Sequence, residues 1–336
     1  MNIIADSGGI VKWSEKKAES KAVAAKMYAA AKEFSDNSLL RRSFAMYDCG
    51  RYVELKVCPD CGRAEVQRAN LCRDRFCPTC AWRLSRRRFA EMCSTIALVE
   101  DLQSYTPAFL TLTVRNCAAE DLGSTVKKMA KDWNKMMVRK EIATMVGGFA
   151  RSLEITYNAG TKRFHPHYHV ILLFKESKSQ ATMQRLFRYV WRSCCRLEYE
   201  PITDFRFVDS GCSPEKLEAA ICETYKYTVK PGALAKMPLD IFYEMTKALK
   251  NVRTASFGGC IKAARALLGF SDTEAPEEGD SCDILGAACS CGGKMATAIA
   301  EWSFDKTAYK ILEVLINDEW KAAEDLAENF QREQSV

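Results

Sequence analysis

The sequence lacks any hydrophobic run long enough to cross a membrane. Apolar stretches such as residues 170–174 are far shorter than the ~20 residues that a spanning helix requires. Residues 1–17 contain no charged segment followed by an apolar run, so we expect no signal peptide. The chain also lacks internal repeats and a phosphate-binding glycine loop, which argues against DNA unwinding by this chain alone. We therefore expect a soluble cytoplasmic protein without a membrane partner.

Histidine is scarce, and its placement is informative. The 336 residues include 3 histidines, which occupy positions 165, 167 and 169 directly before the apolar run 170–174. Because side chains alternate along a strand, His167 and His169 share one face. Two imidazoles on one face form a candidate site for a divalent metal. The alternative is that each histidine is half-buried and satisfied by a carbonyl group.

A third metal ligand is expected from the segment that precedes the histidines. Residues 148–157 resemble a strand, and residues 158–161 (Asn-Ala-Gly-Thr) resemble the turn of a hairpin. A hairpin centred near Gly160 places Glu154 opposite His167, on the face of the imidazoles. A shift of one residue in the pairing would turn Glu154 away, and it would then be a solvated strand residue.

Cysteine is abundant, with 16 residues, and without an export signal we expect thiols rather than disulfides. The spacing of four cysteines matches a two-knuckle zinc site with a closed, structural coordination sphere: Cys58, Cys61, Cys77 and Cys80. Cys72 is a fifth candidate that would replace one of these four. A second knuckle formed by Cys282, Cys289 and Cys291, with Cys260, is a weaker candidate because its spacing is irregular. We interpret seven others as small buried hydrophobic residues: Cys49, Cys93, Cys117, Cys194, Cys195, Cys212 and Cys222.

Positive charge is concentrated around the predicted zinc module. Residues 62–88 have a net charge of +6, equal to that of the whole chain. Arginine contacts to phosphate would give salt-dependent DNA binding, and contacts to base edges would add sequence recognition. The candidate DNA-binding residues are Arg73, Arg75, Arg83, Arg86, Arg87 and Arg88. The alternative is a solvated arginine-rich surface. A second basic run is better explained as the wet face of a helix over residues 122–140, opposite Val126, Met129 and Trp133.

The C-terminal part of the sequence is acidic. From residue 271 onward it has fifteen acidic and five basic residues. The first part of this region is expected to be an exposed linker. Residues 305–330 show the apolar spacing of an amphipathic helix. This tail would fold onto the basic face or contact a partner protein.

A helix is also predicted from Ser213 to Lys230, because Pro214 favours its first turn and Pro231-Gly232 ends it. Glu223 and Tyr227 then form an i, i+4 pair on one flank, with Lys230 beyond them and Lys226 nearby. Tyr225 falls nearer the apolar side. Taken alone, this pattern also fits two packing tyrosines.

Together these segments resemble a known protein family. The His-apolar-His strand is similar to that of the HUH endonucleases, and the longer pattern resembles the rolling-circle replication initiator (Rep) proteins of small bacterial plasmids. Four segments carry the resemblance, in the family's order: residues 71–83, 109–116, 165–173 and 223–230. Their kinship implies a sheet related to the RNA-recognition or ferredoxin-like core.

The resemblance also implies a reaction. The tyrosine at 227 would attack single-stranded or supercoiled plasmid origin DNA to form a 5′-phosphotyrosine, with Mn²⁺ or Mg²⁺ bound by Glu154, His167 and His169. Lys226 and Lys230 would stabilise the phenolate, since an unperturbed tyrosine has a pKa near 10. Glu223 would serve the second, terminating step. The host helicase and replication machinery are candidate partners.

The predicted fold class is α+β: an antiparallel sheet with the metal on one face and helices on the other, plus a small cysteine-rich zinc module and a C-terminal helical tail. The predicted domains are a helical region (1–48), a zinc and DNA-binding module (49–95), the nicking domain (96–270), an acidic linker (271–292) and the tail (293–336). Two other functions compete: an HUH relaxase or transposase for DNA mobilisation, and a non-catalytic zinc-dependent DNA-binding regulator. The regulator leaves the histidines and the Glu223/Tyr227 pair unexplained.

Overall fold

The computed structural model describes residues 8–58, 60–61, 63–175, 179–208, 220–221, 223–225, 228–229, 231–270, 289, 291–316 and 319–322. The chain divides into two compact units, one of residues 1–80 with 275–336 and one of residues 81–274. Among the described residues, no helix is both long and apolar enough to cross a membrane. The domain boundaries and domain functions expected from the sequence remain predictions.

The first unit begins with two helices, α1 (Gly8–Glu33) and α2 (Asn37–Asp48), which confirm the helical N-terminal region. The carboxylate of Asp36 caps α2 by accepting a hydrogen bond of 2.9 Å from the Leu39 amide. The helices contact each other, and Met27 of α1 and Met46 of α2 are both fully buried. An N-cap and a buried apolar side therefore fix this pair of helices.

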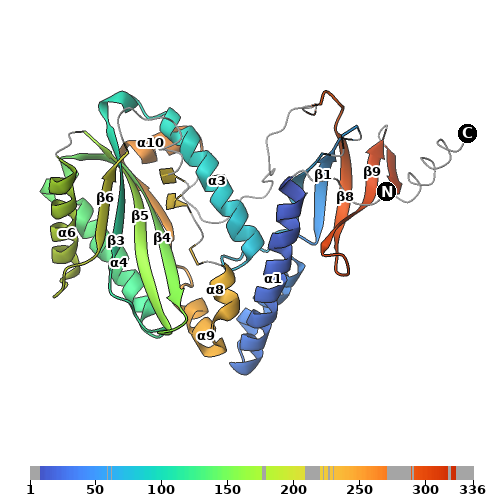
Figure 1. Cartoon of the computed structure of the whole chain (residues 1–336), viewed down its shortest axis with the longest axis horizontal. Helices are drawn as coiled ribbons and strands as arrows, with labels where there is room; N and C mark the ends of the chain where they lie inside the picture. Colours follow the sequence, from blue (N-terminus) through green and yellow to red (C-terminus); the bar gives the residue numbers. More distant parts are fainter. Residues whose placement is uncertain are drawn as a thin grey trace, which may run out of the picture. The chain divides into compact units, whose positions relative to one another are not determined.

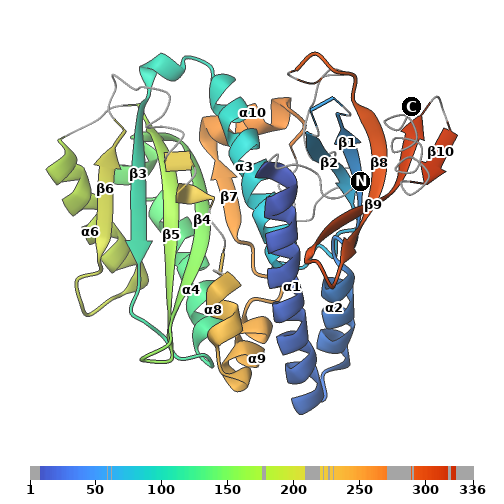
Figure 2. The same ribbon diagram turned by 45° about the vertical axis from the view of Figure 1, so that its right-hand side comes forward.

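The sheet of the first unit joins residues from both ends of the chain. Its order is β10-β9-β8-β1-β2, and all its pairings are antiparallel. Figure 2 shows β1 and β8 as neighbours, with Leu55 opposite Ala298. The strand bounds are β1 (Tyr52–Val57), β2 (Ala64–Ala69), β8 (Ala296–Ser303), β9 (Ala308–Ile316) and β10 (Glu319–Ala322).

The predicted C-terminal helix over residues 305–330 is wrong in its described part, because β9 and β10 occupy 308–316 and 319–322. Tyr309, Ile311 and Val314 are aromatic or β-branched residues, which fit a pleated strand better than a helix. The deciding interaction is the pairing of β9 with β8, which itself pairs with β1. Helical spacing within one segment does not reveal that the preceding segment forms a strand able to pair with it.

The second unit contains a five-stranded antiparallel sheet of order β6-β3-β5-β4-β7. Figure 1 shows β6, β3, β5 and β4 side by side. The central strands β4 and β5 are the longest, and a short turn connects them, as the hairpin prediction required. The strand bounds are β3 (Thr106–Thr113), β4 (Val146–Asn158), β5 (Arg163–Phe174), β6 (Thr203–Phe207) and β7 (Ala255–Gly258).

Helices cover both faces of this second sheet. On one face, the ring of Tyr168 lies 6.1 Å from Trp133 and 6.3 Å from Trp191, which come from α4 and α6. On the other face, Ile171 belongs to a buried cluster with Met92 of α3 and Ile261 of α10. The expected α+β class is confirmed, but helices are not confined to one face. The helices of this unit are α3 (Pro78–Ala97, which starts in the first unit), η1 (Leu102–Ser104), α4 (Leu122–Met137), α5 (Lys140–Ala143), α6 (Gln180–Cys195), α8 (Pro231–Lys236), α9 (Leu239–Ala248) and α10 (Gly259–Leu267).

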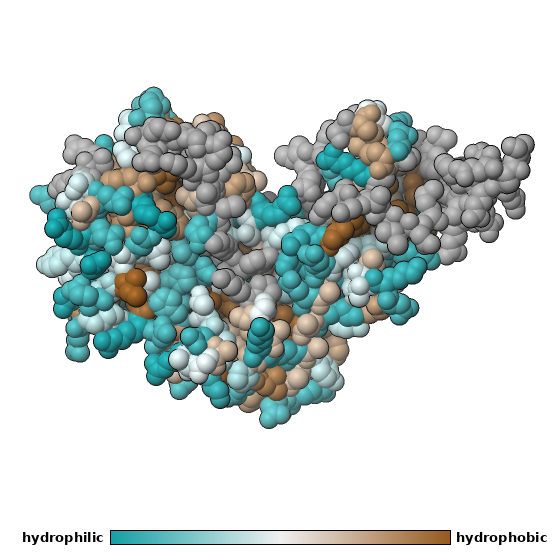
Figure 3. Space-filling view, in the orientation of Figure 1, coloured by the Kyte–Doolittle hydropathy of each residue, from teal (hydrophilic) through white to brown (hydrophobic). Residues whose placement is uncertain are grey.

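The exterior contrasts with these cores. On the face shown in Figure 3, the coloured residues are mainly hydrophilic, and hydrophobic residues form small separate areas. This distribution agrees with the near-complete burial of large side chains such as Trp133, Trp191 and Phe187. Burial of apolar area is the dominant favourable contribution to folding.

We predict that Glu91→Ala lowers the free energy of unfolding by about 3 to 5 kcal/mol, because it leaves a buried charge without its partner. The Glu91 carboxylate on α3 accepts a hydrogen bond of 3.0 Å from Arg265 on α10, and both residues are buried. Denaturant titration provides the measurement. The control is Glu244→Ala, which removes an exposed pair with Lys247 and should cost less than about 1 kcal/mol. Equal losses of unfolding free energy in the two variants would show that the buried pair contributes no more to stability than the exposed pair.

Candidate functional site

Three side chains from the central hairpin converge on one face of the second sheet. Glu154 of β4 lies opposite His167 of β5, which confirms the predicted register. The Glu154 Oε2 atom lies 3.1 Å from Nε2 of His169 and 3.5 Å from Nε2 of His167. The exposed fractions of these residues are only 7%, 9% and 8% for Glu154, His167 and His169. The hairpin thus forms a compact carboxylate–imidazole cluster.

Neighbouring groups hold the two imidazole rings in place. Nδ1 of His167 lies 3.1 Å from the carbonyl oxygen of His165, which can only accept a hydrogen bond. Nδ1 can donate to this carbonyl, which leaves Nε2, the atom that faces Glu154, as the atom that would hold a metal ion. Nδ1 of His169 lies 3.4 Å from the Thr111 hydroxyl on β3. Such contacts fix ring orientation in metal sites.

His165 lies on the same strand but outside the cluster. Its Nδ1 atom lies 2.8 Å from the amide oxygen of Asn116. Burial and the neighbouring His167 lower the pKa of His165. Thr111 and Asn116 both belong to the segment 109–116 noted in the sequence, although their contacts with the histidines were not predicted.

The cluster fits a divalent cation. Ligand atoms about 2.1 Å from one ion lie about 3.0 Å apart at right angles and about 3.4 Å apart at tetrahedral angles. The two separations from Glu154 fall close to this range, and all three ligand atoms lie within 4.8 Å of one another. Burial alone would raise the pKa of the Glu154 carboxyl, but its interactions with His167 and His169 outweigh burial and hold that pKa well below its usual range. The carboxylate is therefore charged and available as a ligand.

The structure describes only part of the predicted catalytic helix. Tyr227, Lys226 and Lys230 lie outside the described residues, whereas Glu223 is described, half-buried and helical. Tyr225 is 2% exposed and packs with Ile221 in the cluster that includes Ile171 of β5. This placement agrees with the expected apolar side of the helix.

The predicted helix does not continue to Lys230, because Tyr225 lies in a turn and Thr228 and Val229 lie in a bend. At Thr228 the chain instead returns to β4, the strand that carries Glu154. The Thr228 carbonyl oxygen accepts a hydrogen bond of 2.7 Å from the amide of Ile155, the residue after Glu154. Thr228 therefore lies at the edge of β4, one residue along the strand from a candidate ligand. Sequence spacing alone did not indicate this contact.

The predicted DNA-binding arginines occur in both units. Arg73 and Arg75 belong to the first unit, and Arg83, Arg86, Arg87 and Arg88 lie on α3 within the second. Arg73 and Arg86 are exposed. Two others have structural partners: Arg87 donates to Glu91 at 2.6 Å, and Arg88 donates to the Thr254 hydroxyl at 3.4 Å.

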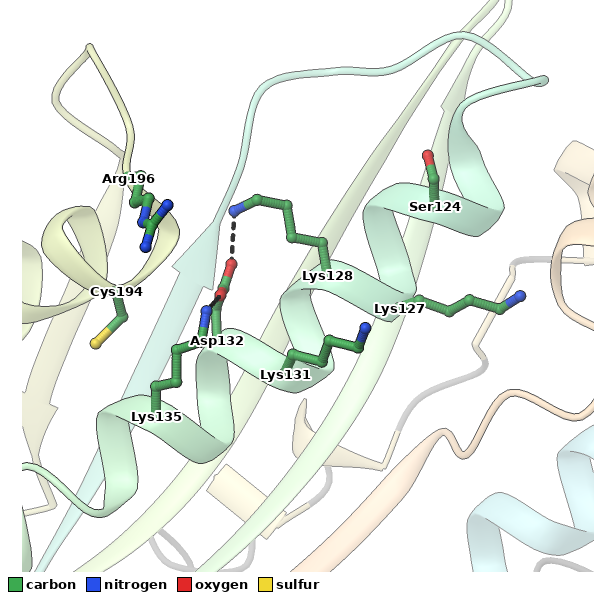
Figure 4. Close-up of a pocket in the computed structure, with 8 residues that line it drawn as sticks. All are labelled: Ser124, Lys127, Lys128, Lys131, Asp132, Lys135, Cys194 and Arg196. Atoms are coloured by element: carbon green, nitrogen blue, oxygen red, sulfur yellow. Dashed lines mark hydrogen bonds and ion pairs between the residues drawn. The ribbon is translucent and has the colours of Figure 1, made fainter.

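A second group of cations surrounds a pocket of about 470 Å³ beside α4 (Figure 4). Lys128 and Lys135 donate to the buried carboxylate of Asp132 at 2.6 and 2.7 Å. Lys128 also donates to the carbonyl of Cys195 at the end of α6, at 2.6 Å. Two of the lysines thus stabilise helix packing, which agrees with the predicted wet face of an amphipathic helix.

The predicted grouping of Cys58, Cys61, Cys77 and Cys80 in one zinc site is wrong. Cys77 and Cys80 lie with Cys49 and Cys72, whereas Cys58 and Cys61 lie with Cys289 and Cys291. The two knuckles separate because Cys58 follows β1, while Cys77 and Cys80 lie at the start of α3, close to Cys49 at the end of α2.

The grouping also revises the expectations for other cysteines. Cys49 is a cluster member and not merely a buried hydrophobic residue. Cys117, Cys194 and Cys195 are buried, as expected, whereas Cys93 and Cys260 are half-buried. Cys212, Cys222 and Cys282 lie outside the described residues.

The fold and the hairpin cluster define an α+β protein with a candidate metal centre on its antiparallel sheet. The family Rep_1, described as "Replication protein", matches residues 63–310. The chain belongs to this family of replication proteins. The kinship with Rep proteins expected from the sequence is thereby confirmed.

Curated relatives support this membership. The chain is 29% identical to "Protein rep" of Bacillus amyloliquefaciens, over 70% of this chain and 75% of the relative. It is 27% identical to "Protein rep" of Lactiplantibacillus plantarum, over 91% of this chain and 97% of the relative. A third "Protein rep", from Streptococcus pneumoniae, is 28% identical over 63% of this chain and 68% of the relative. No solved structure matches the chain.

We predict that His169→Ala and Glu154→Gln each weaken Mn²⁺ binding at least about tenfold, because each removes one of three ligands. Calorimetric titration of the purified protein provides the measurement. The control is His165→Gln, which lies on the same strand but outside the cluster and should bind Mn²⁺ as the wild type does. Unchanged affinity in Glu154→Gln would remove Glu154 from the ligand set.

Proposed function

We propose that the protein initiates plasmid rolling-circle replication by nicking one DNA strand at the origin and transferring it through a tyrosine. The observation that carries the proposal is the buried cluster of Glu154, His167 and His169 in a member of the replication-protein family. A non-catalytic DNA-binding regulator would gain nothing from three metal-ligating side chains on one sheet face. A relaxase or transposase would use the same chemistry, but family membership favours replication.

A bound Mn²⁺ or Mg²⁺ would draw negative charge from the non-bridging oxygens of the scissile phosphate and fix its orientation. The chain supplies the ligands for this role. Glu154 contributes a charged carboxylate, and His167 and His169 contribute oriented Nε2 atoms. Because the protein supplies only three ligands, the metal ion keeps further coordination positions for phosphate oxygens.

In the proposed reaction, the phenol oxygen of Tyr227 attacks the phosphorus and the bond to the 3′ oxygen breaks. The phenol proton leaves, and the departing oxygen becomes a free 3′-hydroxyl that can prime synthesis. The product is a 5′-phosphotyrosine, which keeps a phosphoester bond available for rejoining. Lys226 and Lys230 would favour the phenolate, because a positive charge stabilises the anion.

The choice of Tyr227 over Tyr225 is supported by the surroundings of Tyr225. Burial raises the pKa of the Tyr225 phenol, which makes it a poor nucleophile. Its hydroxyl is buried and has no hydrogen-bond partner among the described residues. The hydrogen bond between Thr228 and Ile155 connects the residue after Tyr227 to the strand that carries Glu154. Both observations favour Tyr227.

Binding to the origin is assigned to the arginine-rich segment. Arg73, Arg75, Arg83 and Arg86 would contact phosphates or base edges, and Arg87 and Arg88 would add charge while they hold α3. Binding through phosphates weakens as salt rises, because the release of counterions from DNA, which favours binding, gains less free energy at higher salt.

We predict that Tyr227→Phe abolishes the covalent protein–DNA adduct, whereas Tyr225→Phe retains it. Denaturing electrophoresis of labelled single-stranded origin DNA with Mn²⁺ measures the adduct. Tyr225→Phe is a matched control because it removes one buried, unpaired hydroxyl and leaves the ring in the core. An adduct formed by Tyr227→Phe but absent from Tyr225→Phe would identify the other tyrosine.

We also predict that Glu223→Ala nicks DNA normally but fails to terminate. The first attack requires only the tyrosine and the metal, whereas release requires a second nucleophile to lose its proton. Glu223 lies four residues before Tyr227 in the sequence, and in the proposed reaction its carboxylate accepts the proton of a water that attacks the phosphotyrosine. The variant should accumulate adduct or over-long products in a replication assay. Normal termination by this variant would show that Glu223 has no role in release and is a surface carboxylate that contributes little to stability.

A further inference from the structure

The eight cysteines of the two clusters form two separate tetrads. In the first tetrad, Sγ of Cys49 lies 3.5 Å from Sγ of Cys80 and 3.6 Å from Sγ of Cys77. Sγ of Cys72 lies 3.7 Å from Sγ of Cys80. Four thiolates about 2.3 Å from one zinc ion are about 3.8 Å apart, so these distances approach the edges of a zinc tetrahedron.

The second tetrad has the same dimensions. Sγ of Cys58 lies 3.5 Å from Sγ of Cys291, and Sγ of Cys61 lies 3.5 Å from Sγ of Cys289. In each tetrad all four sulfur atoms lie within 4.8 Å of one another. A disulfide would require about 2.05 Å between two sulfurs and would leave the other pair unexplained.

The surroundings of the first tetrad favour thiolates. The Cys72 amide points to Sγ of Cys49 at 3.4 Å, and the Ser20 hydroxyl lies 3.3 Å from Sγ of Cys77. Cys80 lies in the first turn of α3, where the helix dipole stabilises negative charge. Lys17, only 1% exposed, donates to the carbonyl of Cys49 at 2.7 Å. A buried cation offsets the net charge of −2 that Zn²⁺ with four thiolates carries.

The backbone of the second tetrad forms tight turns on both sides. The Cys58 amide donates to the carbonyl of Arg63 at 2.8 Å, and the Cys289 amide donates to the carbonyl of Gly293 at 2.9 Å. Gly292 has φ +88°, a conformation that glycine adopts without strain. A Cβ atom at Gly293 would lie 2.8 Å from Sγ of Cys58 and would overlap the carboxylate of Asp60. Glycines at these two positions therefore allow the chain to close around the sulfurs.

We propose that the chain binds two structural zinc ions, one in each tetrad, and that the second zinc ion clips residues 289–291 to residues 58–61. The paired cysteines are far apart in the sequence: 228 residues separate Cys61 from Cys289, and 233 residues separate Cys58 from Cys291. The clip fixes the ends of β1 and β8, which pair directly along Tyr52–Val57. Neither zinc ion has an open coordination position, so both are separate from the proposed metal of Glu154, His167 and His169.

The test is metal counting by mass spectrometry on full-length protein and three variants. We expect about two zinc ions per chain in the wild type, about one in Cys289→Ser, about one in Cys77→Ser and none in the double variant. The control is Cys194→Ser, which changes a buried cysteine outside both tetrads and should retain two. One zinc ion in the wild type, lost from Cys77→Ser but kept in Cys289→Ser, would overturn the proposal. Bound iron, or no bound metal, would overturn it as well.

A second measurement, on wild-type protein, tests the proposal even if the cysteine variants do not fold. Cys61 and Cys291 are exposed, so free thiols at these positions should react rapidly with iodoacetamide in wild-type protein. Bound zinc should protect both until a chelator removes it, and peptide mass spectrometry would report this protection. Rapid alkylation of Cys61 and Cys291 in zinc-loaded protein would overturn the second site, whatever the variants do.

Discussion

The candidate metal centre depends on one pairing, that of β4 with β5. Side chains alternate along strands, so a shift of one residue would send Glu154 to the opposite face. The register is held by a long run of pairs from Phe149 to Asn158, and Ala150 opposite Ile171 lies in the buried core. The metal cluster is therefore positioned by apolar residues several positions away from it, because burial of Ile171 and Leu173 on that face fixes the register for His167 and His169.

This dependence explains why sequence analysis placed the cluster correctly. The alternation of His167 and His169, the turn near Gly160 and the distance to Glu154 are all local, and a hairpin converts local spacing into contacts. The helices α1 and α4 were also predictable, α4 because it carries its own apolar side and α1 because its segment is rich in alanine and lysine, which favour a helix. What the local pattern did not provide was the Thr111 contact to His169 or the return of the chain at Thr228, which require neighbours from other parts of the sheet.

The two wrong predictions, the single zinc site and the C-terminal helix, both arose because the deciding partner lies outside the segment that carries the pattern. Cys58-x2-Cys61 and Cys77-x2-Cys80 have ideal spacing for one site, yet the partners of Cys58 and Cys61 come from residues 289 and 291. Likewise, residues 308–316 show helical spacing but pair as a strand with β8. In the first case the deciding contact joins the two ends of the sequence, whereas in the second it joins β9 to the neighbouring strand β8, which pairs in turn with β1. No pattern within one segment contains that information.

Two zinc ions would explain how such a distant contact becomes stable. Closing a loop of about 230 residues costs on the order of 5 kcal/mol in chain entropy, by the (3/2)RT ln n relation. Four thiolates binding zinc supply about 10–16 kcal/mol in small zinc domains, well above that cost. The first tetrad needs only residues 49–80 and can close early, whereas the second must wait for Cys289 and Cys291. Because Cys289 and Cys291 follow residues 81–274 in the sequence, the second tetrad, and with it the first unit, can be completed only after the second unit has been synthesised.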